Sequence, residues 1–345
     1  MSYFRPHIDS LAGYTPGEQP QAGKFIKLNT NENPYPPSPN VKQAILAVLD
    51  RGLEKYPDPM ANSFRIRAAQ VLGVEPEWIL CGNGSDEILT ILTRAFVGEG
   101  DRLRLPYPSY ILYRTLAEIQ GATSEEVRFN ADWSLPAAFG QGDGKLKLVF
   151  LPNPNSPSGT FIAPDKILEF ARSLPCPLLV DEAYADFASD NCVRLVKECD
   201  KIMVSRTLSK SYSLAGLRFG FLVAQPHIIE GLVKIKDSYN CDALSIAAAT
   251  AAIDDQSHLV ANTAKILATR SRLETKAREL GFAPIPSQAN FVWCPHPSQP
   301  VKPLYERLKA NRILVRYMNY AGWGEGLRIS VGTDEQVDAC LALLA

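Results

Sequence analysis

The sequence predicts an α/β fold with a mostly parallel central sheet, helices on both faces of that sheet, and a smaller α+β domain after it. Short runs that are apolar throughout are typical of strands buried on both faces. These runs alternate with stretches of helical apolar spacing, which favours parallel strands. Near residue 243 the pattern changes to one long helical stretch followed by three strand-like runs. We therefore expect an N-terminal arm over residues 1–40, a large domain over 41–243 and a small domain over 244–345.

The first forty residues are rich in proline and glycine. Because proline disfavours helix for itself and for the residue before it, the stretch 34–39 is expected to be extended or turning. Such an arm needs a neighbouring surface to lie on. Apolar spacing then predicts helices over residues 41–49, 63–72 and 85–96, the last with Ser85 as its N-cap.

Strands and helices alternate through the rest of the large domain. The predicted strands are residues 102–105, 146–151, 178–181, 201–205 and 219–224, and the predicted helices are 109–120, 164–173 and 226–237. In the small domain a helix is expected over 257–280, where Gly281 suits the C-terminal cap. Strands over 290–294, 313–316 and 327–331 and a closing helix over 334–344 complete the prediction.

The composition excludes several classes of protein. Hydrophobic residues make up 46% and charged residues 21% of the 345 residues, which is ordinary globular usage and excludes disorder as the main theme. The 36 basic and 37 acidic residues leave a formal net charge of −1, so we expect no nucleic-acid or membrane partner. No apolar run approaches the roughly 20 residues that span a bilayer. The first residues also lack the layout of a signal peptide.

Cysteine and histidine usage points to the cytoplasm and away from metals. The seven cysteines are an odd number without a C-x-x-C pair, which predicts reduced thiols in a cytoplasmic protein. The four histidines form no close pair, so we expect no metal site. An enzyme that acts on small molecules fits these exclusions.

Polar side chains follow several predicted strands at the point where each strand ends. In a parallel α/β sheet, ligands bind beyond the carboxyl ends of the strands, so these side chains are expected to share one site. A carboxylate, a phenol, a lysine and an arginine at one sheet edge form an unusual set. In chain order, the candidates are Asn153, Asn155, Ser156, Asp181, Tyr184, Thr207, Ser209, Lys210 and Arg218.

The charged members of this set each have a functional and an ordinary interpretation. Lys210 can form an imine with a carbonyl compound if its amine is neutral, or it is a solvated surface lysine. Arg218 can bind phosphate as a two-pronged donor, or it is a surface ion-pair partner. Asp181 ends a buried strand, where a carboxylate is costly unless paired. A protonated heterocyclic nitrogen is one such partner, and a turn or helix-cap role is the alternative.

Three further features are compatible with ligand binding. The segment GNGSDE at residues 82–87 precedes a predicted helix, whose free N–H groups favour a phosphate, although its acids also suit any first helical turn. Tyr110 and Tyr113 can stack on a flat cofactor ring or belong to the core. Arg328 interrupts an apolar strand and needs an anionic partner, either a substrate or a structural carboxylate.

Together these segments resemble the fold-type I, pyridoxal-phosphate-dependent aminotransferases. The resemblance covers nearly the whole chain. One such segment would be weak evidence, but this many in the same order make a chance match very unlikely. The segments are KLNTNENP (27–34), KYPDP (55–59), GNGSDE (82–87), NPNSPSG (153–159), DEAY (181–184), TLSK (207–210), GLR (216–218), ANFV (289–292), ILVR (313–316) and LRISVGT (327–333).

The resemblance implies pyridoxal 5'-phosphate (PLP) as the cofactor and assigns roles to the candidates. Lys210 would hold the cofactor as an imine and move a proton between the substrate and cofactor carbons. Asp181 would keep the pyridine nitrogen protonated, so that the ring withdraws electrons. Tyr184 would donate to the phenolic oxygen of the cofactor, and Tyr110 would stack on its ring. The cofactor phosphate would be held by Gly84, Ser85, Thr207, Ser209 and Arg218.

The contact to the cofactor's ring oxygen is expected to come from Asn155. Related chains often have two asparagines before a Pro-Thr-Gly segment, whereas this chain has Asn155 followed by Ser156. If the contact belongs to the second position, Ser156 would have to make it with a shorter side chain.

The resemblance also implies partners and substrates. Tyr56 would reach the cofactor phosphate of a neighbouring subunit, which implies a homodimer with shared active sites. Arg328 would bind the anionic end of the substrate, with Arg316 and Asn33 as further substrate-binding residues. The division of the anions between Arg316 and Arg328 stays open.

The branch of the family that the chain resembles transfers the amino group of glutamate to imidazole-acetol phosphate. That reaction yields histidinol phosphate and 2-oxoglutarate in histidine biosynthesis. An aromatic or broad-range aminotransferase and a threonine-phosphate-type decarboxylase are the alternatives within the same fold, because specificity depends on pocket shape. A non-catalytic binding module is disfavoured, since the cofactor residues are all present.

Overall fold

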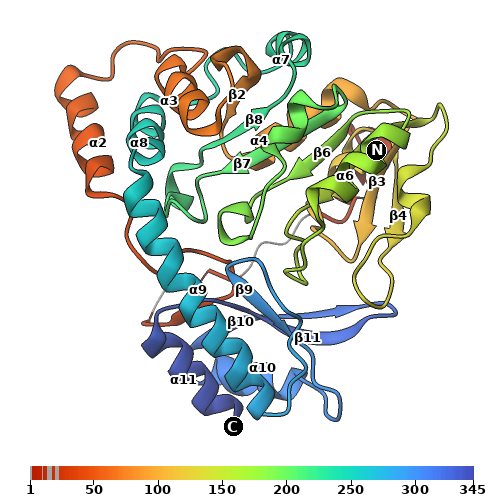
Figure 1. The fold of residues 1–345 in the computed structure, drawn as a ribbon, viewed down its shortest axis with the longest axis vertical. Coiled ribbons are helices and arrows are strands. Elements are labelled where there is room, and N and C mark those ends of the chain that lie inside the picture. Colours follow the sequence, from red (N-terminus) through yellow and green to blue (C-terminus); the bar gives the residue numbers. More distant parts are fainter. Residues whose placement is uncertain (1, 10, 14–17, 20–22) are drawn as a thin grey trace.

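The described residues form two sheets, the larger of which has seven strands in the order β2-β8-β7-β6-β5-β3-β4 (Figure 1). The computed structural model describes residues 2–9, 11–13, 18–19 and 23–345. The strands of the larger sheet are β2 (Ile79–Gly82), β3 (Arg102–Tyr107), β4 (Thr123–Arg128), β5 (Leu146–Pro152), β6 (Leu178–Asp181), β7 (Ile202–Thr207) and β8 (Gly220–Val223). Strand β8 runs antiparallel to both of its neighbours, and the other pairs are parallel. The predicted mostly parallel sheet is thus confirmed.

Helices cover both faces of this sheet because its strands are apolar on both sides. In β5, Leu148 and Phe150 join one core, and Val149 and Leu151 join the other. The first core includes side chains of α4 (Ser85–Phe96), α5 (Leu112–Ile119) and α7 (Pro226–Val233). The second core includes side chains of α2 (Pro39–Arg51), α3 (Asn62–Leu72), α6 (Pro164–Ser173) and α8 (Ala243–Asp254).

A four-stranded sheet with the order β1-β10-β11-β9 lies below the larger sheet in Figure 1. It has a third hydrophobic core of its own. Its strands are β1 (Ile26–Leu28), β9 (Phe291–Cys294), β10 (Ile313–Tyr320) and β11 (Gly324–Ser330), and its helices are α9 (Gln256–Glu279), α10 (Lys302–Ala310) and α11 (Asp334–Leu344). Strand β1 comes from the N-terminal arm and pairs in parallel with β10, which is the neighbouring surface that the arm was expected to need. The short helix α1 (Pro6–Asp9) lies against α5, where Arg5 donates to the carbonyl of Ile119 at 3.1 Å.

Several predicted boundaries differ from those in the structure, and several elements were not predicted. Ser85 is the first residue of α4 and not its N-cap; that position belongs to Gly84, whose backbone has φ +82°. Helix α7 ends at Val233, four residues before the predicted end. No element was predicted from the sequence at α1, β1, β2, β4, α8 or α10. Strand β4 lies at the edge of the sheet and carries mostly polar side chains, so it lacks the apolar run of a buried strand. Among the described helices, none combines the length and apolar character that a membrane span needs.

Candidate active site

A cavity of about 690 Å³ lies where side chains of both sheets and of the N-terminal arm meet. The sheet topology explains why candidates distant in sequence share it. Strands β6 and β7 end at this edge, and the antiparallel strand β8 begins there, with Gly220 paired to both Thr207 and Gly82. The predicted site residues that line the cavity are Ser85, Tyr110, Ser156, Asp181, Tyr184, Thr207, Ser209, Lys210, Arg218, Arg316 and Arg328.

Lys210 occupies the cavity wall just after β7. Its Nζ atom donates a hydrogen bond to the carbonyl oxygen of Thr30 at 3.1 Å and lies 5.9 Å from the centre of the Tyr184 ring. Burial, and after it the positive charge of Arg328, lower the pKa of Lys210 from 10.5 to about 8. A sizeable fraction of the amine is therefore neutral near pH 8, and a neutral amine can attack a carbonyl group.

Asp181 is a buried carboxylate at the end of β6, and its hydrogen-bond donors are neutral. Its Oδ1 accepts from the Ser205 hydroxyl at 3.3 Å and the Ala183 N–H at 3.2 Å, and its Oδ2 accepts from the Tyr113 hydroxyl at 2.6 Å. Burial raises the pKa of Asp181, and the donors oppose that rise. A carboxylate in this position is stabilised further by a cationic ligand group in the cavity.

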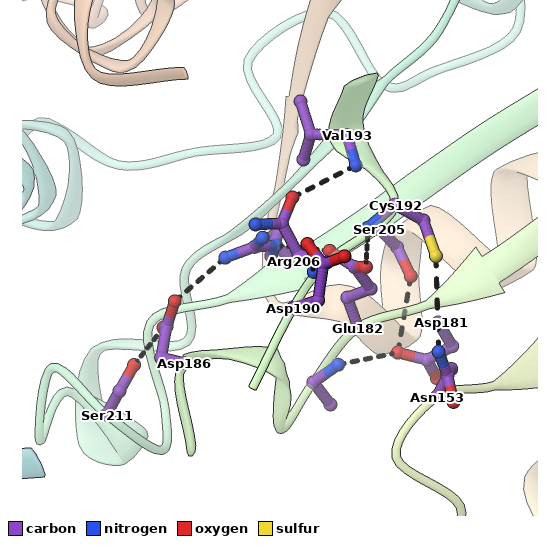
Figure 2. Close-up of polar contacts among 12 residues, drawn as sticks. Asn153, Asp181, Glu182, Asp186, Asp190, Cys192, Val193, Ser205, Arg206 and Ser211 are labelled. Atoms are coloured by element: carbon purple, nitrogen blue, oxygen red, sulfur yellow. Dashed lines mark hydrogen bonds and ion pairs between the residues drawn. The ribbon is translucent and has the colours of Figure 1, made fainter. Parts of the chain in front are cut away.

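A charged network lies behind Asp181 and links the strand ends that carry the site (Figure 2). Arg206 on β7 pairs with Glu182 through Nε and with Asp186 through Nη1, both at 2.8 Å. Asp186 also accepts a hydrogen bond from Ser211, the residue after Lys210. The network therefore joins the loop after β6 to the loop that positions Lys210.

The start of α4 forms an anion cradle with Arg218. The first N–H groups of a helix have no partner within it, so they are free to bind an anion. Arg218 donates to Ser209 at 3.2 Å and lies 3.3 Å from the carboxylate of Asp86. A Cβ atom at Gly84 would lie 2.7 Å from Arg218 Nη2, and one at Gly220 would lie 2.6 Å from the Ser85 nitrogen. These two glycines leave the room that the cradle needs.

Tyr184 is held by the N-terminal arm, through residues that the sequence did not single out. Its hydroxyl accepts from Asn31 Nδ2 at 2.9 Å, and Asn31 is in turn bound to Ser330 on β11 and to Asn290 before β9. Asn31 has φ +58°, a conformation that asparagine adopts more readily than most residues. The asparagine-rich run at 29–33 was the available signal.

Arg328 and Arg316 face each other as directly paired residues of β11 and β10, and both line the cavity. Arg328 donates to the Ser156 hydroxyl at 3.0 Å and to the carbonyl of Asn29 at 3.1 Å. Its guanidinium carbon lies 5.2 Å from the centre of the Phe291 ring. The two guanidinium groups make this wall suitable for an anionic ligand.

Five predicted site residues do not line the cavity, and one of them, Asn153, exchanges hydrogen bonds with the backbone of Ile162 at 3.0 and 2.8 Å. Gly84 lies behind Arg218, and Asn33 donates to the carbonyl of Ser211 at 3.1 Å, beside Lys210. Asn155 donates to Ser158 at 2.8 Å in its own loop and to the carbonyl of Pro108, just after β3, at 3.2 Å, whereas Ser156 lines the cavity. Tyr56 is 81% exposed and stacks on Tyr239 with ring centres 4.4 Å apart.

The residues present fit the cofactor that the resemblance implies. The cradle offers N–H groups, hydroxyls and a guanidinium to a phosphate. Asp181 offers a buried carboxylate to a cationic ring nitrogen, and Lys210 offers an amine to a carbonyl carbon. Within the described part of the chain, no group of three or more His, Cys, Asp or Glu residues is placed to hold a metal ion.

Comparisons with known proteins agree with this site. The family model for aminotransferase class I and II matches residues 23–344. A histidinol-phosphate aminotransferase from Rhodopirellula baltica is 60% identical over 99% of this chain and 94% of its own length. One from Geotalea uraniireducens is 45% identical over 100% of this chain and 99% of its own length.

A solved structure is similar over the full chain. The histidinol-phosphate aminotransferase from Sinorhizobium meliloti, in complex with pyridoxal-5'-phosphate, superposes with a TM-score of 0.90 and 29% identity. The alignment covers 100% of this chain and 97% of that one. With its sheet order, its cavity and these relatives in agreement, the chain belongs to the class I and II aminotransferases.

Proposed function

We propose that this aminotransferase uses PLP to transfer an amino group between glutamate and imidazole-acetol phosphate, forming histidinol phosphate and 2-oxoglutarate in histidine biosynthesis. The observation that carries the proposal is the placement of Lys210, Asp181 and the Arg218 cradle on one cavity. The 60% identical relative is named for that activity and aligns over 99% of this chain, which supports the same substrate here.

Different cavity residues would hold different parts of PLP. The start of α4, with Thr207, Ser209 and Arg218, would bind the phosphate, Asp181 would bind the ring nitrogen, and Lys210 would bind the reactive carbon. Bound PLP supplies a ring that accepts the electron pair released when the C–H bond of the amino donor breaks. Lys210 Nζ would take up the proton from the carbon of the amino donor and deliver it to the reactive carbon of the cofactor. Tyr184 Oη stabilises the cofactor's phenolic oxygen.

The arginine pair binds the anionic end of each substrate. Arg328 is held in place by Ser156 and Asn29, so its guanidinium is oriented before a ligand enters. Arg316, opposite it on β10, adds a second cation to the same wall. A phosphate carries more charge than a carboxylate, so two cations suit histidinol phosphate, while a single carboxylate of glutamate needs fewer contacts.

The active enzyme is a homodimer in the cytoplasm. Leu46 and Leu49 on α2, Leu53 after it and the Tyr56–Tyr239 pair are all exposed, and a second copy of the chain would cover this apolar surface. Tyr56 then reaches the cofactor phosphate of the other subunit. The seven cysteines are free thiols, which suits a reducing compartment.

An amino-donor panel tests the proposed activity. Purified holoenzyme is mixed in single turnovers with histidinol phosphate, glutamate, phenylalanine or tyrosine, and conversion of PLP to its amine form is followed by absorbance. Histidinol phosphate and glutamate are expected to convert the cofactor at rates well above those of the aromatic amino acids. Equal or faster conversion by phenylalanine and tyrosine would assign the aromatic activity instead. Release of CO₂ from a phosphorylated amino acid would assign the decarboxylase.

A further inference from the structure

Tyr113 makes the shortest hydrogen bond to Asp181, and its side chain is fully buried. The tyrosine lies on α5, and its hydroxyl donates to Asp181 Oδ2 at 2.6 Å. Its ring packs against Phe150 at 5.1 Å between ring centres and against Tyr110 at 5.5 Å, with no exposed surface. This packing against β5 and against the segment before α5 fixes the position of the hydroxyl.

The groups around Asp181 leave Tyr113 as its principal donor. Ser205 and the Ala183 N–H bind the other carboxylate oxygen at 3.3 and 3.2 Å. The negative charge of Asp86 on α4 acts against ionisation of Asp181, as burial does. Tyr110 and Tyr184 are the other titratable groups that face the Tyr113–Asp181 pair. Burial, and after it the charge of Asp181, raise the pKa of Tyr113 well above 10, so its hydroxyl stays a donor at any working pH.

We propose that Tyr113 is a positioning residue that fixes Asp181 and keeps its carboxylate ionised toward the ring nitrogen of the cofactor. The inference rests on the proposed function, because it assigns a role relative to PLP. A hydrogen bond donated to a carboxylate favours the ionised form. Without it, Asp181 becomes the better base and draws the proton away from the ring nitrogen. The ring then withdraws electrons less strongly, and proton removal at the substrate carbon slows.

Tyr113→Phe in the holoenzyme tests the proposal, since the variant keeps the ring that packs on Phe150. Loss of a hydrogen bond to a charged group is expected to weaken PLP binding and to lower the glutamate half-reaction rate by roughly 10- to 100-fold. The pH titration of the visible absorption band is expected to shift as well. A merely structural role would not move that spectroscopic signature.

Two further variants serve as controls. Ser205→Ala removes a longer bond to Asp181 and is expected to give the same changes on a smaller scale. Tyr212→Phe removes the hydroxyl of a half-buried tyrosine that accepts a hydrogen bond from the Gln256 amide, and it is expected to leave the band titration and the rate unchanged. Melting curves of all variants separate a loss of folding stability from a loss of the effect of Tyr113 on Asp181.

A double-mutant cycle covers the case in which Tyr113→Phe is destabilised. In an Asp181→Asn background the Tyr113 hydroxyl has no carboxylate to act on, so Tyr113→Phe is expected to cause little further loss. Fully additive losses, or a Tyr113→Phe enzyme with wild-type band titration and PLP affinity, would overturn the proposal. A wild-type protein that binds PLP and reacts with glutamate but ignores histidinol phosphate leaves the Tyr113 test intact and removes only the proposed substrate. A wild-type protein that binds no PLP overturns both.

Discussion

The amine of Lys210 donates to the carbonyl oxygen of Thr30 at 3.1 Å, which brings the N-terminal arm into contact with the reactive lysine. The same short stretch of the arm supplies Asn31 to Tyr184 and the Asn29 carbonyl to Arg328. Residues 29–31 are therefore a wall of the active site.

The lowered pKa of Lys210 predicts how the apoenzyme takes up its cofactor. Only the neutral amine attacks the carbonyl carbon of PLP, and the neutral form predominates above the pKa of about 8. The rate of covalent attachment should therefore rise with pH, with a midpoint near 8, and fall at lower pH. Stopped-flow absorbance of apoenzyme mixed with PLP measures this profile.

Arg328→Gln should move that midpoint upward, because Arg328 is the main positive charge that lowers the Lys210 pKa. Arg316→Gln is the matched control, since Arg316 faces Arg328 across the strand pair, and it should shift the midpoint less. An unchanged midpoint in the Arg328 variant would contradict this electrostatic explanation.

Gly84→Ala should weaken cofactor binding through a clash as well as backbone strain. Gly84 has φ +82°, and its Cβ would lie 2.7 Å from Arg218 Nη2. Gly100→Ala is the matched control, because Gly100 has φ +79° and open space at the Cβ position. Both variants should lose roughly 1 kcal/mol of unfolding free energy from the strained backbone. Only Gly84→Ala should raise the dissociation constant of PLP, and equal affinities in the two variants would contradict the cradle.

Arg328→Lys should raise KM for both substrates, since lysine keeps the charge but loses the planar two-pronged donor. We expect roughly a 10- to 100-fold loss in kcat/KM, the range for losing a hydrogen bond to a charged group. Ser156→Ala removes only a neutral acceptor of Arg328 and should cost less. Steady-state kinetics with histidinol phosphate and with glutamate compare the variants, and a larger effect of Ser156→Ala would contradict the assignment.

The proposed sharing of active sites between two subunits predicts complementation between two inactive variants. Lys210→Ala lacks the amine, and Tyr56→Ala lacks the proposed contact to the other subunit's cofactor. In a mixed dimer, the site built on the Tyr56→Ala subunit has Lys210 and receives the intact Tyr56 of the other subunit. Activity should therefore reappear after the two proteins are unfolded together and refolded, but not when each is refolded alone. No recovery in a verified mixed dimer would contradict shared sites.

Strands β5, β6, β7 and β8 were predictable because their apolar runs reflect burial on both faces, whereas β2 was missed although it is also buried. Strand β6 was predicted with its observed bounds, since three buried apolar residues precede Asp181 at the edge of the cavity. Strand β4 was missed because an edge strand with one wet face needs no apolar run, and its residues are TSEEVR. Whether a strand is central or at the edge depends on the pairing of distant segments, which a local pattern does not contain.

From the residue pattern alone, the site residues that could be predicted are those that follow the ends of strands. Asp181, Thr207 and Lys210 meet because parallel strands end at one edge, which is a property of the topology. The contact of Tyr113 with Asp181 depends on how α5 packs against the sheet. The Asn155 side chain does not line the cavity, because a short amide readily forms hydrogen bonds with nearby groups, here with the Ser158 hydroxyl. Such choices are settled by packing and local hydrogen bonding.

Mass spectrometry of the borohydride-reduced holoenzyme tests the central claim most directly. Reduction makes the bond between the lysine and the cofactor permanent, so digestion leaves the cofactor on one peptide. We predict that the added mass lies on the peptide containing Lys210, and that Lys210→Ala carries none. Added mass on a different lysine, or none on the wild-type protein, would contradict the account.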